Sequence, residues 1–158
     1  MTGPRGITIR PPRPQDLAAV IRIEQASFSD PWSDAFLAEE LANDVLRMAL
    51  VAEGPEGVCG YVMAWRVAEQ LHVLNIATDP ALRRRGVGGF LLREAALRAW
   101  AQGLREITLE VRRSNTSARH FYRKRGLQEL AVRKGYYADN GEDALIMTGP
   151  LDSVLDSD

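Results

Sequence analysis

The stretch RRRGVGGFLL, residues 83–92, constrains the fold of this chain more than any other part of the sequence. It follows a strand-like run at 70–79 and leads into 90–102, where apolar residues recur at helical spacing. The first turn of a helix exposes unpaired backbone N–H groups and carries a partial positive charge. Glycine lets such a turn approach a ligand closely, because it has no Cβ. The junction is therefore predicted to bind an anion, above all a phosphate group.

The junction matches neither of two familiar phosphate-binding loops. A P-loop ends in G-K-[ST], which is missing, and a dinucleotide fingerprint needs a third glycine where this chain has Leu91. A basic patch for nucleic acid is disfavoured, because 20 basic and 21 acidic residues give a net charge of −1. We therefore expect no direct binding of nucleic acid. From these residues alone, an ordinary structural junction remains an alternative.

The order of strand-like and helix-like segments predicts a mixed α/β (α+β) sheet with helices on both faces. The segment 106–111 follows the helix at 90–102 as a further strand, so it and 70–79 form a βαβ unit and should be parallel. The other neighbours can be antiparallel. Strands are expected at 7–10, 46–54, 58–69, 127–137 and 142–147, and helices at 17–26, 33–44 and 115–126.

Length and composition suit one domain, which we place at residues 1–150, followed by a short acidic tail at 151–158 that we expect to be loose. A single cysteine, Cys59, excludes an internal disulfide and fits a cytoplasmic protein. With one cysteine and two histidines, we expect no metal site. No apolar run approaches the roughly 18 residues of a membrane span, and no signal peptide is expected.

Three stretches, LHVLNIATDPALRRRGVGGFLL, LEVRRSNTSARHFYRKRGL and YYADNGEDALIM, resemble the GNAT superfamily of acyl-CoA N-acetyltransferases. With DPWS at 30–33, they are more narrowly similar to the bacterial branch that acetylates the N-terminal alanine of a ribosomal protein. The resemblance covers nearly the whole chain. It implies a mostly antiparallel sheet with one parallel pair of strands, acetyl-CoA as cosubstrate, and a protein N-terminus as acceptor.

By position, the resemblance assigns the junction to the diphosphate of acetyl-CoA. The backbone amides that would hold the two phosphates are those of Arg84, Arg85, Gly86, Val87, Gly88 and Gly89. The backbone of Ile76, Ala77 and Thr78 would run beside the pantetheine arm, and Asn115 would hydrogen-bond that arm. Two positions depart from the common pattern: Arg83, where glutamine is frequent, and Gly89, where a larger residue is frequent.

The resemblance also assigns the chemistry. Glu110 would be the general base, acting through a water, and Tyr122 the general acid that protonates the coenzyme A sulfur. From the strand alone, Glu110 could instead be a structural partner of Arg112 or Arg66. Tyr122 could also be a packing residue. Because Phe121 and Tyr122 are adjacent and so point in different directions, we assign Phe121 to the core and Tyr122 to the cosubstrate.

The acceptor groove is assigned to three aromatic residues, Trp32, Tyr136 and Tyr137, each of which could also be ordinary packing. The sequence leaves other acceptors open, since a lysine side chain or a small-molecule amine would need the same cosubstrate site. A non-catalytic regulator that binds acyl-CoA is a further alternative.

Overall fold

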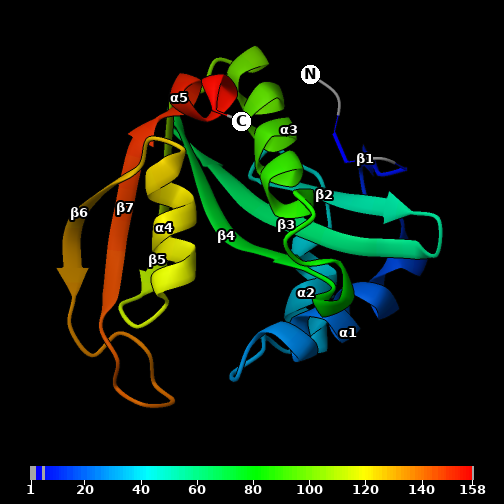
Figure 1. Ribbon diagram of the computed structural model, residues 1–158, viewed down its shortest axis with the longest axis horizontal. Helices are drawn as coiled ribbons and strands as arrows, with labels where there is room; N and C mark the ends of the chain where they lie inside the picture. Colours follow the sequence, from blue (N-terminus) through cyan, green and yellow to red (C-terminus); the bar gives the residue numbers. More distant parts are fainter. Residues whose placement is uncertain (1–2, 5, 158) are drawn as a thin grey trace.

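The computed structural model describes residues 3–4 and 6–157, and a seven-stranded sheet forms its centre (Figure 1). The strands are Thr8–Arg10 (β1), Arg47–Gly54 (β2), Gly57–Val67 (β3), Gln70–Thr78 (β4), Glu106–Arg112 (β5), Gln128–Arg133 (β6) and Ala144–Pro150 (β7). Their order across the sheet is β1-β2-β3-β4-β5-β7-β6. Every neighbouring pair is antiparallel except β4 and β5, so the predicted mixed sheet with one parallel pair is confirmed.

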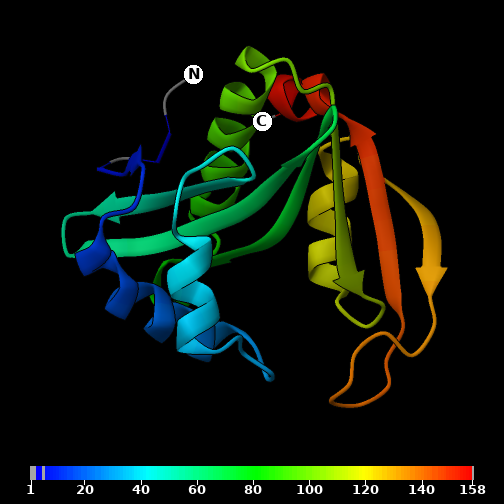
Figure 2. The same ribbon diagram turned by 180° about the vertical axis from the view of Figure 1, so that it is seen from behind.

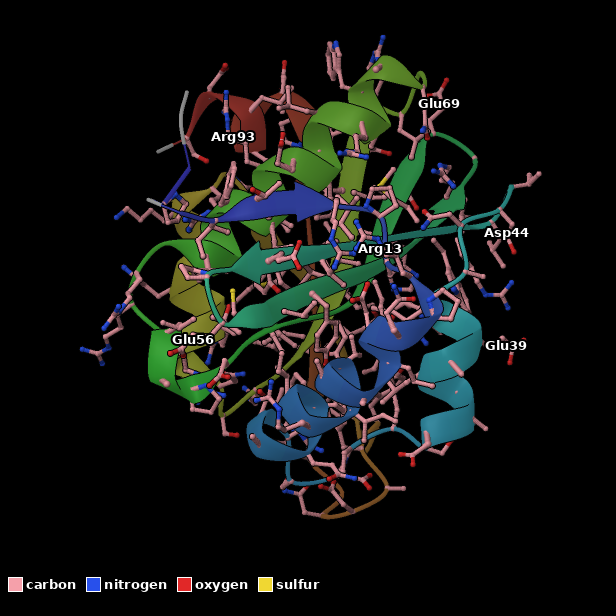
Figure 3. The ribbon with its side chains drawn as sticks, turned by 90° about the vertical axis from the view of Figure 1, so that its right-hand side faces the viewer. Arg13, Glu39, Asp44, Glu56, Glu69 and Arg93 are labelled. Atoms are coloured by element: carbon pink, nitrogen blue, oxygen red, sulfur yellow. The ribbon has the colours of Figure 1, made fainter. Side chains whose placement is uncertain are left out.

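Helices cover both faces of the sheet, as predicted. They are Leu17–Ser27 (α1), Asp34–Glu40 (α2), Val87–Ala101 (α3), Thr116–Lys124 (α4) and Leu151–Asp156 (α5), with short 3-10 turns at Pro14–Asp16 and Pro80–Leu82. Seen from the β1 edge (Figure 3), α3 lies above the sheet and α1 and α2 lie below it. None of the described helices is both long and apolar enough to cross a membrane.

The two faces of the sheet have separate hydrophobic cores. The larger core lies under α3, α4 and α5 and includes Leu91 and Leu92 of α3. The smaller core lies under α1 and α2 and includes Val20 and Ile23 of α1. Side chains alternate between the two faces along a strand, so β3 supplies Val62 to the larger core and its neighbours Tyr61 and Met63 to the smaller core.

The parallel strands β4 and β5 pair only over their first halves. Gln70 to Val73 pair with Glu106 to Leu109, and beyond this point the two strands diverge (Figures 1 and 2). A bulge at Leu74 accompanies the divergence, because Met63 pairs with Asn75 while Ala64 pairs with Val73. The carboxyl ends of β4 and β5 therefore stand apart in the middle of the sheet.

The expectation of a loose tail is wrong for Leu151–Asp156, which form helix α5. Leu151 is fully buried and Val154 is 1% exposed, and both belong to the larger core. Apolar residues at 151, 154 and 155 give this acidic segment an apolar stripe at helical spacing, which packs against α3. The acidic composition of the segment does not reveal this stripe.

Candidate active site

The glycine-containing junction connects β4 to α3. Gly86 is the N-cap of α3 and has a left-handed backbone with φ of +82°. Arg84 also has a positive φ, +66°, which is uncommon for a residue with a side chain. The first bond of the helix runs from the Phe90 N–H to the Gly86 carbonyl, 3.0 Å. The N–H groups of the preceding turn, residues 87–89, are therefore free of intrahelical partners and available to an anion.

Two adjoining cavities lie where β4 and β5 diverge. One, of about 440 Å³, is lined by Ile76, Ala77, Thr78, Gly88 and Phe121 and reaches the junction. The other, of about 670 Å³, is lined by Trp32, Glu110, Arg112 and Tyr137. Ser27, Phe28, Ile76, Asn115, Ala118 and Tyr122 line both. Most of the residues predicted for cosubstrate, chemistry and acceptor are thus brought to one continuous cleft.

Glu110 lies in the second cavity and is held by His72. The two residues share a face of the sheet, because His72 pairs with Thr108 and Glu110 is two residues further along β5. The His72 Nε2 atom is 2.7 Å from Glu110 Oε2. This hydrogen bond, with the charge of Arg133 on β6 as a smaller cause, lowers the pKa of Glu110 against the effect of burial. Neither Arg66 nor Arg112 is its partner, and sequence reasoning did not find His72.

Tyr122 on α4 is 7% exposed and lines both cavities. Burial raises the pKa of its hydroxyl, so Tyr122 is protonated at neutral pH. The assignment of Phe121 to the core is confirmed in part, because its ring packs against the larger core. The ring is only partly buried, however, and its other side lines the cavity beside the junction.

The three aromatic residues predicted for the acceptor differ in position. Trp32 and Tyr137 line the second cavity, and the Tyr137 ring lies under the Arg112 guanidinium at 4.0 Å. Burial raises the pKa of Tyr137 to about 12. Tyr136 is 47% exposed and lines neither of the two cavities. It belongs to the loop after β6, where the adjacent positions 136 and 137 point in different directions.

Asn115 has the structural role that its position before α4 predicts. Its Oδ1 atom accepts a hydrogen bond from the Ala118 N–H at 3.1 Å, which makes it the N-cap of the helix. The same residue lines both cavities. Because the cap uses only Oδ1, the Nδ2 group of Asn115 is left for a ligand in the cleft.

Glu24 is a second residue of the cleft that sequence reasoning missed. This α1 carboxylate is 1% exposed, yet it lines the second cavity. It accepts hydrogen bonds from the Tyr61 hydroxyl, from Asn75 Nδ2 at 2.7 Å and from the Trp32 N–H at 3.0 Å. Glu24 lies in the apolar stripe of α1 next to Ile23. An acid at such a position was the available signal.

Within the part of the chain that the structure describes, no cluster of three or more His, Cys, Asp or Glu side chains is placed to hold a metal ion. Cys59 is buried, and burial raises the pKa of its thiol. The ionisable side chains that line the cleft include the carboxylates of Glu24 and Glu110 and the phenols of Tyr122 and Tyr137.

A glycine turn with free amides thus lies beside a split pair of parallel strands, and the crystal structure of an N-acetyltransferase has the same fold with a TM-score of 0.84. Residues 17–127 match the family described as "Acetyltransferase (GNAT) family", so the chain belongs to the GNAT acetyltransferases and is an N-acetyltransferase enzyme.

Individual relatives show which members of the family the chain resembles. A Bacillus subtilis protein of the ribosomal protein bS18-alanine N-acetyltransferase type is 38% identical over 88% of this chain and 92% of its own. An N-alpha-acetyltransferase from Sulfurisphaera tokodaii is 34% identical over 90% and 92%. The crystal structure of the Escherichia coli ribosomal-protein-S18-alanine N-acetyltransferase matches with a TM-score of 0.84 at 30% identity, over 92% of this chain and 94% of that one.

Proposed function

We propose that the protein transfers the acetyl group of acetyl-CoA to the N-terminal α-amino group of a protein, and that the acceptor is the N-terminal alanine of a ribosomal protein. Relatives named for that acceptor match most of the chain. The observation that carries the proposal is a continuous cleft that runs from the free amides of α3 past Tyr122, which lines both cavities, to Glu110. We place this activity in the cytoplasm.

The residues of the junction fit the phosphates of acetyl-CoA. The amides of the first turn of α3 supply donors, and Gly88 has no side chain where the helix meets the cavity. A Cβ at Gly88 would lie 3.7 Å from the Thr78 hydroxyl and 4.0 Å from the Phe121 ring. Larger side chains at this position would therefore enter the cleft. The backbone of 76–78 lines the same cavity and supports a pantetheine arm beside it.

The opposite part of the cleft suits the acceptor. Trp32 and Tyr137 provide aromatic walls for a peptide, and the Glu110 carboxylate attracts its terminal ammonium group. A free α-amino group has a pKa of about 8, so at neutral pH it is mostly ammonium and must lose a proton before it can attack a thioester.

The proposed reaction divides between the two sides of the cleft. Glu110, directly or through a water, accepts the ammonium proton, and the freed amine forms the new bond to the acetyl carbon. A backbone amide at the end of β4 donates to the carbonyl oxygen as negative charge develops there. The carbon–sulfur bond breaks, and Tyr122 gives its proton to the departing thiolate. The nitrogen of the new amide releases its second proton, which restores the Tyr122 phenol, and Glu110 passes the proton that it accepted to solvent, so one proton is released for each acetyl group transferred.

Mass spectrometry of short peptides incubated with the protein and acetyl-CoA tests the acceptor. Peptides that begin with Ala, Ser, Gly or Met are compared with an N-terminally blocked peptide carrying an internal lysine, and with small amines. We expect acetylation at the free N-terminus, strongest for alanine. Modification of only the blocked peptide or the small amines would overturn the proposed acceptor.

A second arm separates catalysis from mere binding. Glu110→Gln and Tyr122→Phe should each reduce turnover by about 10²-fold or more while coenzyme A still binds. Unchanged turnover in both variants would contradict the assigned roles. Absence of turnover in the unmodified protein with every acceptor, despite binding of coenzyme A, would favour the non-catalytic regulator.

A further inference from the structure

Arg125, directly after α4, reaches across to the first turn of α3. Its Cζ atom lies 3.8 Å from the centre of the Phe121 ring, and its Nη1 donates to the Phe121 carbonyl oxygen at 3.0 Å. A Cβ placed on Gly89 would lie only 2.6 Å from Arg125 Nη2. The guanidinium therefore occupies the space that a side chain at position 89 would need.

The charge of Arg125 has no acidic partner among the described residues. Arg119 and Arg123 of the same helix both pair with Glu129, whereas no carboxylate of residues 3–4 and 6–157 lies within ion-pair distance of Arg125. The group is partly buried, and burial lowers its pKa. Removing a cation from water is costly unless an anion compensates. Stacking on Phe121 offsets only part of that cost.

The guanidinium, which has no described acidic partner, lies next to a backbone donor of α3. Gly89 is the third residue of α3, so its N–H belongs to the turn that has no intrahelical acceptor. The Phe121 ring beneath Arg125 lines the cavity at this turn. Arg125 and Gly89 themselves line neither cavity, but a cation and free amides lie side by side next to this end of the cleft, where one anion would contact both.

We propose that Arg125 is a phosphate-binding residue for the cosubstrate, and that Gly89 is glycine because it makes room for the guanidinium. The inference rests on the proposed use of acetyl-CoA and adds a side-chain ligand to the backbone amides. It also accounts for the departure at position 89, since a larger residue there would displace Arg125. The phosphate is either in the diphosphate of coenzyme A or at its 3′ position.

Isothermal titration with coenzyme A tests the proposal without any acceptor. Arg125→Gln should raise the dissociation constant about tenfold, the loss of one charge-assisted contact. Lys124→Gln removes the same charge from the exposed neighbouring residue and should change it less than about twofold. An unchanged dissociation constant in Arg125→Gln, or equal losses in both variants, would overturn the proposal.

Gly89→Ala provides a second variant that leaves Arg125 chemically intact. The added methyl group should displace the guanidinium and weaken binding about as much as Arg125→Gln. In the Arg125→Ala background the space is open, so Gly89→Ala should then have almost no effect on binding. Equal effects of Gly89→Ala in the two backgrounds would show that position 89 acts independently of Arg125 and would contradict the pairing. Thermal melts without ligand confirm that each variant folds.

Dephospho-coenzyme A identifies which phosphate is bound. A loss that persists with this ligand assigns Arg125 to the diphosphate, and a loss that disappears assigns it to the 3′-phosphate. If the unmodified protein binds coenzyme A but acetylates no N-terminus, the proposed function fails while the role of Arg125 stands. If the unmodified protein does not bind coenzyme A, both proposals fail.

Discussion

At the scale of single residues, the hydrogen bond between His72 and Glu110 determines when the candidate base is available. His72 lies behind Glu110 and does not line either cavity of the cleft, so its role is to position and stabilise the carboxylate. Because the bond lowers the pKa of Glu110, the carboxylate is ionised and ready to accept a proton at neutral pH.

We expect His72→Ala to raise the pKa of Glu110. Burial, which opposes ionisation, would then act with less compensation. A base works only when deprotonated, so the acidic limb of the pH profile of kcat/KM should move to higher pH. NMR titration of the Glu110 carboxyl carbon measures this pKa directly. His72→Gln keeps an N–H donor, so its Glu110 pKa should lie between those of the unmodified protein and of His72→Ala. An unmoved carboxyl titration in His72→Ala would rule out this positioning role.

Glu24 is the residue whose replacement should be most costly for stability near the cleft. Its carboxylate accepts from three donors, and the amide of Glu24→Gln would place an N–H₂ group against at least one of them. We expect a loss of about 2 kcal/mol in the free energy of unfolding, and a higher KM for the peptide because Trp32 loses its anchor. Urea denaturation measures the first effect. Glu56→Gln, in an exposed turn, is the control, and an equal loss in both variants would contradict a special role for Glu24.

Local signals in the sequence predict individual residues unevenly. Ser33 and Asn115 cap α2 and α4, and both are residue types that favour the N-cap position. The side-chain partners of Glu110 and Glu24 come from other elements. His72 is 38 residues from Glu110 in the sequence, and Tyr61 and Asn75 are 37 and 51 residues from Glu24. No helical or strand periodicity encodes such pairs, so they required the folded chain.

At the scale of whole elements, the split between β4 and β5 was not predictable from the sequence pattern. The βαβ order predicted that the two strands are parallel, and this is confirmed. How far they remain paired depends on the bulge at Leu74 and on the α1–α2 and α3–α4 layers, which are tertiary features. Periodicity in the sequence therefore does not predict the cleft between the two strands.

Helix α5 is a structural element that covers the larger core. Val154 is almost fully buried there, so Val154→Ala should lower the free energy of unfolding by about 2 kcal/mol. Asp156→Ala, at an exposed position of the same helix, should stay within about 0.5 kcal/mol. Urea denaturation of both variants checks this. Equal stabilities would mean that α5 does not contribute to the cooperative core.

At the scale of the whole molecule, the cleft lies between two parts of the sheet that share few strand contacts. β1 to β4 form one part and β5 to β7 the other, and only the first halves of β4 and β5 connect them directly. The proposed site draws residues from both parts, with the junction after β4 on one side and α4 after β5 on the other. A ligand in the cleft would therefore bridge the two parts.

Acetyl-CoA should protect both sides of the split at once. Backbone amides at the end of β4 and in the first turn of α3 would gain partners, and the α4 segment would be held closer to them. We expect slower hydrogen exchange in peptides that cover 75–90 and 110–122, with the exposed edge strand β6 unchanged.

At a ligand concentration of about 100 times the dissociation constant, the free energy of unfolding should rise by about 2.7 kcal/mol. Gly88→Val, which fills the cleft at the turn, should remove both effects. Protection confined to one side would show that the ligand does not bridge the split, and the site would then need a different account.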